Sequence, residues 1–155
     1  MGRAGNKIFG LGVVLLVLNR DMTKILLLKR NKAKRKKWGY SWGNVGGRTE
    51  LGELMLDACI REAREEIGLK LRKKDVKLFA IKESPCFTPE VHAMHFFYFT
   101  KIDENTRVCI NCESDKCAWF SVNKLPKDII DADLANLIKL VRKKSDVCVL
   151  PGVRV

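Results

Sequence analysis

The chain has 155 residues and a formal net charge of +12, from 30 Lys and Arg against 18 Asp and Glu. Hydrophobic residues make up 46% of it and charged residues 31%, which is typical of a soluble globular protein rather than a disordered one. This length suits one domain, expected over residues 1–155, that buries roughly 70% of its unfolded surface. The positive charge favours anionic partners such as nucleotides, polyphosphates, RNA or an acidic membrane face, without choosing among them.

The apolar run at residues 8–18 is too short to cross a bilayer, and it is followed by a turn signal, so it predicts a buried strand. Further strands are predicted at 24–30, 76–83, 92–102 and 117–122, and helices at about 53–67 and 129–143. Residues 145–155 are expected to form another short strand or a loose tail. Strands around a central helix, with a helix near the end, predict an α/β fold in which a mixed sheet has helices on both faces.

Six cysteines occur without a signal-peptide pattern. We therefore expect a cytoplasmic protein with mostly reduced thiols and no membrane association. Three of them, Cys109, Cys112 and Cys117, form C-x2-C-x4-C, but a second CxxC is missing. Ordinary small hydrophobic or loop thiols are therefore expected there rather than a zinc site.

Residues 29–37, KRNKAKRKK, hold seven basic side chains in nine positions. Packing seven cations in a core is not feasible, so we expect an exposed loop. The aromatic residues that follow, Trp38, Tyr40 and Trp42, suit stacking on a nucleotide or anchoring of this loop.

Three glutamates, Glu62, Glu65 and Glu66, stand at i, i+3 and i+4 of the helix predicted at 53–67, so they share one of its faces. Like charges in this arrangement repel one another, and a hard divalent cation such as Mg²⁺ or Mn²⁺ removes the repulsion. Glycines before the helix let the backbone approach a phosphate or offer a carbonyl to a metal. A charged, solvated helix is nevertheless the commoner meaning of such a composition.

The spacing of residues 47–69 favours the metal-binding interpretation. It follows G-x5-E-x7-R-E-U-x-E-E-x-G-U, where U is a bulky aliphatic residue, with Ala63 as a small residue at the first U. This pattern resembles the signature of the Nudix hydrolase family, and every fixed position is present from Gly47 to Leu69. The resemblance implies a three-layer α/β/α sandwich that hydrolyses a nucleoside diphosphate linked to another moiety, with Mg²⁺ or Mn²⁺ as cofactor.

The resemblance also implies roles for single residues. Arg61 is expected to orient the glutamates, and Glu53 to be a metal ligand or a carboxylate that supports the ligands. Arg48 and Gly47 are expected to face the phosphates. The implied metal ligands are the carbonyl of Gly46 and the side chains of Glu62, Glu65 and Glu66. These three glutamates are also expected to be the main catalytic residues.

The mechanism requires a carboxylate that takes the proton of the attacking water. The glutamates of the 47–69 signature are candidates for this base. Glu113 and Glu90 are also candidates because they lie in predicted loops, although a solvated loop glutamate is the simpler interpretation of either.

One cue outside the 47–69 signature favours nucleoside triphosphates as substrates. The approach WGNVGG resembles the subgroup that sanitises oxidised purine nucleoside triphosphates, although Val45 stands where many family members carry Pro. In that subgroup acidic residues near the start of the last helix can read a purine edge, so Asp131 and Asp133 are candidates. Their alternative role is to complement the helix dipole. The expected reaction converts a (d)NTP, oxidised or plain, to NMP and diphosphate.

A second cue favours ADP-ribose or a nucleotide sugar. The segment SPCFTPEVH, residues 84–92, resembles the Ser-Pro-Gly-Phe segment of ADP-ribose pyrophosphatases, with Cys86 in place of the glycine. Phe87, Trp119 and Phe97 are candidates for stacking on a base, or they pack within the protein.

The basic run at 29–37 supports a third alternative. It suits the hydrolysis of RNA 5′ ends or caps, or an RNA-binding module that uses the fold without catalysis. The presence of all the metal glutamates argues against such an idle fold.

Overall fold

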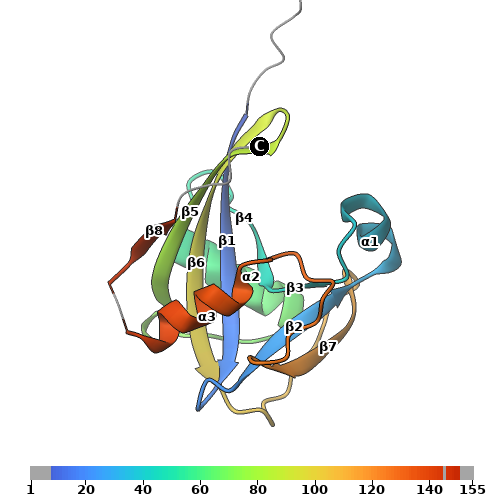
Figure 1. Ribbon diagram of the computed structural model, residues 1–155, viewed down its shortest axis with the longest axis vertical. Helices are drawn as coiled ribbons and strands as arrows, with labels where there is room; N and C mark the ends of the chain where they lie inside the picture. Colours follow the sequence, from blue (N-terminus) through green and yellow to red (C-terminus); the bar gives the residue numbers. More distant parts are fainter. Residues whose placement is uncertain (1–7, 145, 151–155) are drawn as a thin grey trace, which may run out of the picture.

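Figure 1 shows the computed structural model of the protein, in which residues 8–144 and 146–150 are described, apart from the side chain of Cys86. Eight strands form one mixed sheet in the order β3-β2-β1-β6-β5-β8, with β4 beside β1 and β7 beside β2. The strands are β1 (Ile8–Asn19), β2 (Lys24–Arg30), β3 (Trp42–Gly43), β4 (Val45–Arg48), β5 (Lys77–Thr88), β6 (Val91–Ile102), β7 (Ser114–Ser121) and β8 (Cys148–Leu150). The helices are α1 (Lys32–Trp38), α2 (Met55–Ile67) and α3 (Leu134–Arg142), with a 3₁₀ turn at Lys73–Asp75.

β1 is the strand around which the sheet is organised. It pairs in parallel with β6 along its whole length and antiparallel with β2 and β4. Its sequence suits this position, because it carries no charged side chain and residues 15–18 are at most 1% exposed. β4 lies against the middle of β1, with Gly46 opposite Val14 and Gly47 opposite Val13. The glycine pair is therefore fixed to the centre of the molecule.

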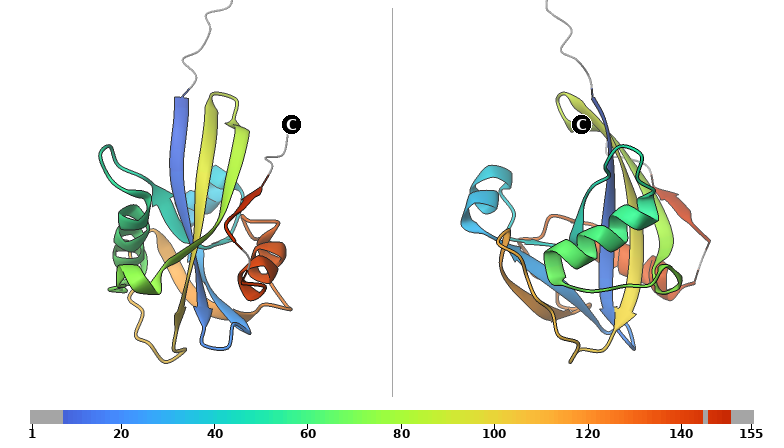
Figure 2. Two further views of the ribbon diagram at one scale, coloured as in Figure 1. Left: turned by 90° about the vertical axis from the view of Figure 1, so that its left-hand side faces the viewer. Right: turned by 180° about the vertical axis from the view of Figure 1, so that it is seen from behind.

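Helices α2 and α3 cover opposite faces of the sheet, as the two views in Figure 2 show. Successive side chains of β1 point to opposite faces, so the strand supplies two cores. The core under α2 contains Val13, Leu15, Val17, Ala58, Cys59, Ala63 and Ile67. The core under α3 contains Leu16, Leu18, Leu134, Leu137, Ile138 and Val141. The predicted three-layer α/β/α sandwich is confirmed.

The end of α2 is fixed as the sequence predicts. Gly68 adopts the left-handed conformation with φ of 70°. Its N–H donates to the carbonyl of Arg64 at 3.1 Å, and the N–H of Leu69 donates to that of Ala63 at 3.2 Å. This termination places the last helical turn, with its glutamates, next to β4.

The prediction of an exposed loop at 29–37 was wrong. The first two of these residues end β2, and residues 32–38 form α1. Asn31 caps this helix by accepting a hydrogen bond from the N–H of Lys34 at 2.9 Å, and Gly39 ends it in the left-handed conformation. Lys, Arg and Ala between these caps are good helix formers. The expected exposure holds, because α1 has no buried residue.

The second helix prediction, 129–143, begins too early. Ile129 instead pairs with Trp42 of β3, and the N–H of Ile130 donates to the carbonyl of Trp42 at 2.9 Å. These tertiary contacts override helix propensity, so α3 begins only at Leu134. Residues 148–150 of the expected tail form β8, whereas 145 and 151–155 lie outside the described residues. Within the described chain, every helix is too short or too polar to cross a membrane.

Candidate active site

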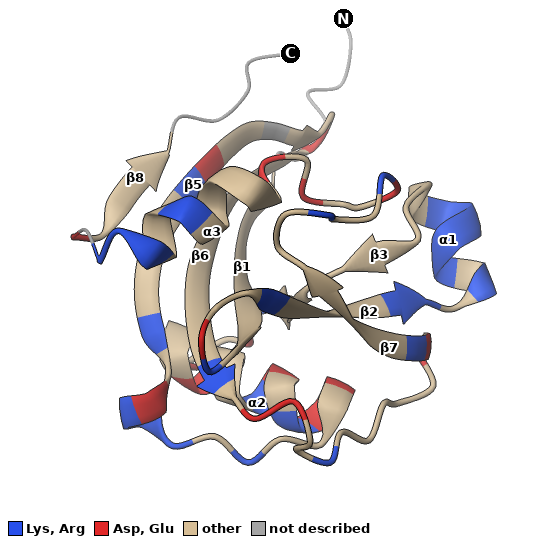
Figure 3. Ribbon diagram, turned by 60° about the horizontal axis from the view of Figure 1, so that its bottom comes forward, with Lys and Arg blue, Asp and Glu red and all other residues tan. Residues whose placement is uncertain are grey.

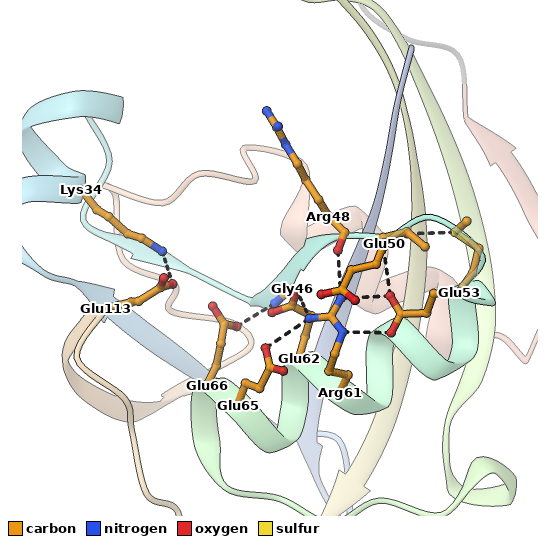
Figure 4. Close-up of polar contacts among 12 residues, drawn as sticks. Lys34, Gly46, Arg48, Glu50, Glu53, Arg61, Glu62, Glu65, Glu66 and Glu113 are labelled. Atoms are coloured by element: carbon orange, nitrogen blue, oxygen red, sulfur yellow. Dashed lines mark hydrogen bonds and ion pairs between the residues drawn. The ribbon is translucent and has the colours of Figure 1, made fainter. Parts of the chain in front are cut away.

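A cleft of about 420 Å³ opens beside α2. Figure 4 shows the polar side chains around it. The cleft is lined by Lys34, Gly46, Gly47, Arg48, Glu62, Glu65, Glu66, Asn111 and Glu113. They come from α1, β4, α2 and the segment between β6 and β7. Four of these nine residues carry carboxylates and two carry cations, so the cleft has the mixed charge of a site that handles both a metal and phosphates.

The two glycines of β4 let its main chain lie directly against α2. The N–H of Gly46 donates to Oε2 of Glu66 at 2.9 Å. A Cβ at Gly46 would overlap the carbonyl oxygen of Val13, and a Cβ at Gly47 would overlap the carboxylate of Glu62. Glycine at both positions is therefore required for β4 to pair with β1 while Glu62 and Glu66 approach it.

Arg61 links three glutamates. Its Nε and Nη2 donate to the two oxygens of Glu53 at 2.9 and 3.1 Å. Its Nη1 donates to Glu62 at 2.9 Å and to Glu65 at 3.2 Å, and Nη2 also reaches the carbonyl of Arg48 at 3.0 Å. The side chains of Arg61 and Glu53 are each only 17% exposed, so this bidentate pair is shielded from water. Arg61 thus fixes the glutamates, and Glu53 lies behind the cleft as its support.

The segment between β6 and β7 brings two further polar residues into the cleft. Its main chain docks on the end of α2, where the N–H of Cys109 donates to the carbonyl of Ile67 at 3.0 Å. The N–H of Asn111 donates to the carbonyl of Glu66 at 3.2 Å, and the side chain of Asn111 accepts from the N–H of Glu113 at 3.0 Å. Glu113, one of the two loop glutamates considered as the base, is therefore held beside the glutamates of α2.

Glu113 forms an ion pair with Lys34 of α1 across the cleft. The carbonyl of Glu113 also accepts a hydrogen bond from the N–H of Asn31 at 2.9 Å, which ties the start of α1 to this segment. Sequence reasoning did not single out Lys34, whose only signal is its place in the basic run. The other candidate base, Glu90, lies at the turn between β5 and β6 and does not line the cleft.

Burial perturbs the glutamates of the cleft unequally. It raises the pKa of Glu66 to about 7; neighbouring Glu62 adds to the rise and the Gly46 amide opposes it. Burial also raises the pKa of Glu62, while its contacts with Arg61 act in the other direction. The hydrogen bond from Arg61 is the main cause that lowers the pKa of Glu53. The charges of these two partly buried glutamates are thus incompletely compensated, and a cation beside them would stabilise their charged forms.

The donor set fits a hard divalent cation. Within residues 8–144 and 146–150, no three His, Cys, Asp or Glu side chains already stand in a metal-binding arrangement. However, Glu62, Glu65 and Glu66 each use one carboxylate oxygen in the contacts above, and the other makes no hydrogen bond to a described residue. Three carboxylate oxygens lining one cleft are the ligands that Mg²⁺ and Mn²⁺ prefer.

A partly buried polar pair, Asn44 and Asp131, lies next to the cleft. Nδ2 of Asn44 donates to Asp131 at 2.8 Å, and burial raises the pKa of Asp131. Oδ1 of Asn44 is buried and has no hydrogen-bond partner among the described residues. Asn44 also lines a smaller space of about 50 Å³ that shares Lys34, Gly46, Glu66 and Glu113 with the cleft. The sequence pointed to Asp131 but not to Asn44, whose importance depends on a contact 87 residues away.

The remaining substrate-binding candidates lie outside the cleft lining. Phe87, at the end of β5, is 49% exposed, and Asp133 is exposed and pairs with Lys82 at 3.5 Å. Trp119 packs against the core under α2, and Phe97 is buried in the core under α3. By contrast, Arg48 and Gly47 line the cleft as expected.

The fold and the site together define a class of protein. A sandwich whose central sheet presents a glycine pair to a glutamate-bearing helix is the arrangement that the sequence signature implied. A family model described as the NUDIX domain matches residues 9–141. The chain belongs to the Nudix hydrolase family.

Individual relatives show how wide this family is. The m7GpppN-mRNA hydrolase NUDT17 of Xenopus laevis is 28% identical over 136 residues, which cover 80% of this chain but only 46% of that protein. The RNA pyrophosphohydrolase of Ruthia magnifica is 27% identical over 132 residues, covering 75% of this chain and 70% of that protein. Among solved structures, the MutT NUDIX hydrolase of Burkholderia pseudomallei has a TM-score of 0.70 at 21% identity, covering 87% of this chain and 99% of that chain. The structural likeness shows the fold alone.

Proposed function

We propose that this chain hydrolyses a phosphoanhydride bond in the 5′ polyphosphate of a nucleotide, using Mg²⁺ or Mn²⁺. The observation that carries the proposal is the convergence of Glu62, Glu65 and Glu66 on the cleft that Arg48 and Lys34 also line. The three glutamates and the carbonyl of Gly46 would hold the metal. When bound, it neutralises the polyphosphate and lowers the pKa of a coordinated water.

The protein's own residues would do the rest. Arg61 keeps the glutamates oriented through its hydrogen bonds, so little reorganisation is needed during the reaction. Arg48 and Lys34 bind phosphate oxygens. Glu113 accepts the proton of the water that attacks phosphorus, the bridging P–O bond breaks, and the second phosphate product leaves with the bonding electron pair.

A free nucleoside triphosphate, oxidised or plain, is the first candidate substrate, and it would yield NMP and diphosphate. The partly buried Asn44–Asp131 pair supports it, because the buried Oδ1 of Asn44 is an acceptor without a donor among the described residues. An N–H group on a purine edge supplies such a donor. Asp133 would contribute from the exposed side of the same segment.

The 5′ end or cap of an RNA is the second candidate. It is supported by the names of the two curated relatives, an mRNA cap hydrolase and an RNA pyrophosphohydrolase, and by the basic helix α1 at the cleft. Both candidates present the same 5′ phosphates to the glutamates. The ADP-ribose alternative has less support, because residues 84–88 belong to β5 and the described side chains among them do not line the cleft.

A substrate panel tests the proposal. Plain and oxidised (d)NTPs, ADP-ribose, dinucleoside polyphosphates, 5′-triphosphorylated RNA and capped RNA are incubated with the protein in Mg²⁺, in Mn²⁺ and in EDTA. We expect cleavage of a 5′-triphosphate substrate that stops in EDTA. Absence of hydrolysis across the whole panel would overturn the proposal, and tight, salt-dependent RNA binding in that case would identify a binding module.

A further inference from the structure

Helix α1 has a composition that its own packing does not explain. Five of its seven residues are basic, its first turn holds no acidic residue, and none of its residues is buried. In Figure 3 most of its ribbon is blue, the colour of Lys and Arg. Like charges three and four positions apart, such as Lys32 with Lys36, destabilise a helix. A helix that fully buries none of its residues and whose like charges repel one another suits a polyanionic ligand.

Polar contacts hold α1 at the mouth of the cleft and leave most of its charge available. Lys34 pairs with Glu113, and Arg35 pairs with Asp115 at 2.6 Å. The remaining cations, Lys32, Lys36 and Lys37, are exposed and form no ion pair with any described residue. The helix is thus anchored through Lys34 and Arg35, and its three other cations face solvent.

Two aromatic side chains extend this basic surface. Trp38 ends α1 and is 41% exposed, and Tyr40 follows it and is 44% exposed. Nζ of Lys37 lies 4.8 Å from the centre of the Trp38 ring. Basic residues next to exposed aromatic rings are the combination that binds single-stranded nucleic acid, because the cations follow the phosphates and the rings stack on bases.

We propose that α1, together with Trp38 and Tyr40, binds the nucleotides of a single-stranded RNA that follow the 5′-terminal one held in the cleft. This inference rests on the proposed hydrolysis of a 5′ polyphosphate and names the substrate class for that site. Lys34 connects the two parts, since it belongs to α1 and lines the cleft. The seven residues of α1 span about 10 Å, which matches roughly three phosphates of a stacked strand.

A binding experiment isolates the surface from the catalytic site. Lys32→Gln/Lys36→Gln/Lys37→Gln keeps the anchoring residues Lys34 and Arg35 and retains helix propensity. Affinity for a 5′-triphosphorylated 12-nucleotide RNA is measured in EDTA, where no metal holds the phosphates, over a range of salt concentrations. The matched control, Lys70→Gln/Lys74→Gln/Lys101→Gln, removes the same charge from exposed residues outside α1 and the cleft.

The α1 variant should bind the RNA at least about 10-fold more weakly near physiological salt. The slope of its log affinity against log salt concentration should be less negative by about 2. The control should stay within about twofold of the wild type. Equal losses in the two variants would reduce the effect to overall charge and overturn the proposal. Binding of the wild type to a DNA of the same sequence as tightly as to the RNA, or more tightly, would also overturn it. So would an α1 variant that keeps its affinity for the RNA and loses only affinity for anionic lipid vesicles.

Two readouts separate this inference from the proposed function. In the α1 variant, the ratio of kcat/KM for the triphosphorylated RNA to kcat/KM for the matching free NTP should fall about 10-fold. A wild type that cleaves both substrates, with this ratio unchanged in the variant, would overturn the inference and leave the hydrolase proposal intact. RNA binding through α1 without hydrolysis of any substrate would support the inference and overturn the hydrolase proposal.

Base stacking gives an independent signal. RNA should quench the tryptophan fluorescence of the wild type, and Trp38→Ala should abolish most of that quenching and weaken binding. Trp38→Phe, which keeps an aromatic face, should retain most of the affinity. Undiminished affinity and quenching in Trp38→Ala would contradict the role of Trp38.

Discussion

Arg61 donates two hydrogen bonds to Glu53, one to each carboxylate oxygen, at 2.9 and 3.1 Å. Both oxygens of Glu53, the first glutamate of the 47–69 signature, therefore accept hydrogen bonds from the arginine, and Glu53 does not line the cleft. The same guanidinium reaches Glu62 and Glu65. The guanidinium therefore positions two of the glutamates proposed to hold the metal.

Arg61→Lys should test this organising role. Lysine keeps the charge but cannot form the bidentate pair with Glu53 while also reaching Glu62 and Glu65. We expect a loss of about 1–2 kcal/mol in the free energy of unfolding and a fall of 10- to 100-fold in kcat. Denaturant unfolding and steady-state kinetics measure the two effects. Arg64→Lys, at an exposed position of the same helix, should change neither, and equal behaviour of the two variants would argue against the role.

Gly47→Ala should damage the site without unfolding the protein. The added Cβ overlaps the carboxylate of Glu62, so that side chain must move. A displacement of about 1 Å costs on the order of 100-fold in rate, which kinetics at saturating Mg²⁺ would reveal. Gly10→Ala is the matched control, because its Cβ meets only ordinary contacts on the same sheet, the nearest at 3.4 Å. Wild-type turnover by Gly47→Ala would show that Glu62 is not needed against β4.

Glu66 should make the metal-free protein less stable as the pH rises. Its pKa is about 7 in the folded protein against an ordinary value of 4.5, so between these two pH values the folded state holds a proton that the unfolded state has released. The wild type therefore loses stability between pH 4.5 and 7, whereas Glu66→Gln has no such titration. In EDTA at pH 8 the variant should be more stable by about 1–3 kcal/mol.

Denaturant unfolding at pH 5, 6.5 and 8 checks this prediction, and the advantage of the variant should shrink towards pH 5. Adding Mg²⁺ at pH 8 should stabilise the wild type more than the variant, because a ligand that binds only the folded state favours it. A stability difference that does not depend on pH would contradict the burial of Glu66 as its cause.

Glu113→Gln should separate the proposed base from the metal ligands. Loss of the proton acceptor should lower kcat by about 100- to 10,000-fold and leave KM within a few-fold. The control is Asp115→Asn, which removes the neighbouring carboxylate that pairs with Arg35. If Glu113→Gln turns over within twofold of the wild type, the base is another group.

Local sequence signals predicted the parts of the site that lie on one helix. The i, i+3, i+4 spacing of the glutamates and the glycine after Ile67 define α2 without reference to the rest of the chain. Its predicted start differed by only two residues, 53 against 55. The caps of α1, Asn31 and Gly39, were equally visible, but the density of charge in the run favoured a loop.

Residues that reach the site through tertiary contacts could not be predicted in this way. Glu113 and Asn111 stand beside Glu66 because main-chain N–H groups of their segment bond to the end of α2, more than forty residues earlier in the sequence. Asn44 and Asp131 meet only because residues 129–131 run along β3. Spacing within a motif carries no information about such tertiary contacts, so the placement of these residues at the cleft could be seen only in the structure.

The most direct test of the account is turnover of a 5′-triphosphate substrate against Mg²⁺ concentration for the wild type, Glu66→Gln and Glu90→Gln. Glu90 lies outside the cleft and serves as the matched carboxylate control. We predict that Glu66→Gln loses on the order of 100-fold or more in kcat and needs more Mg²⁺, while Glu90→Gln follows the wild type. Full turnover by Glu66→Gln at wild-type Mg²⁺ concentrations would contradict the assignment of the glutamate cluster as the metal site.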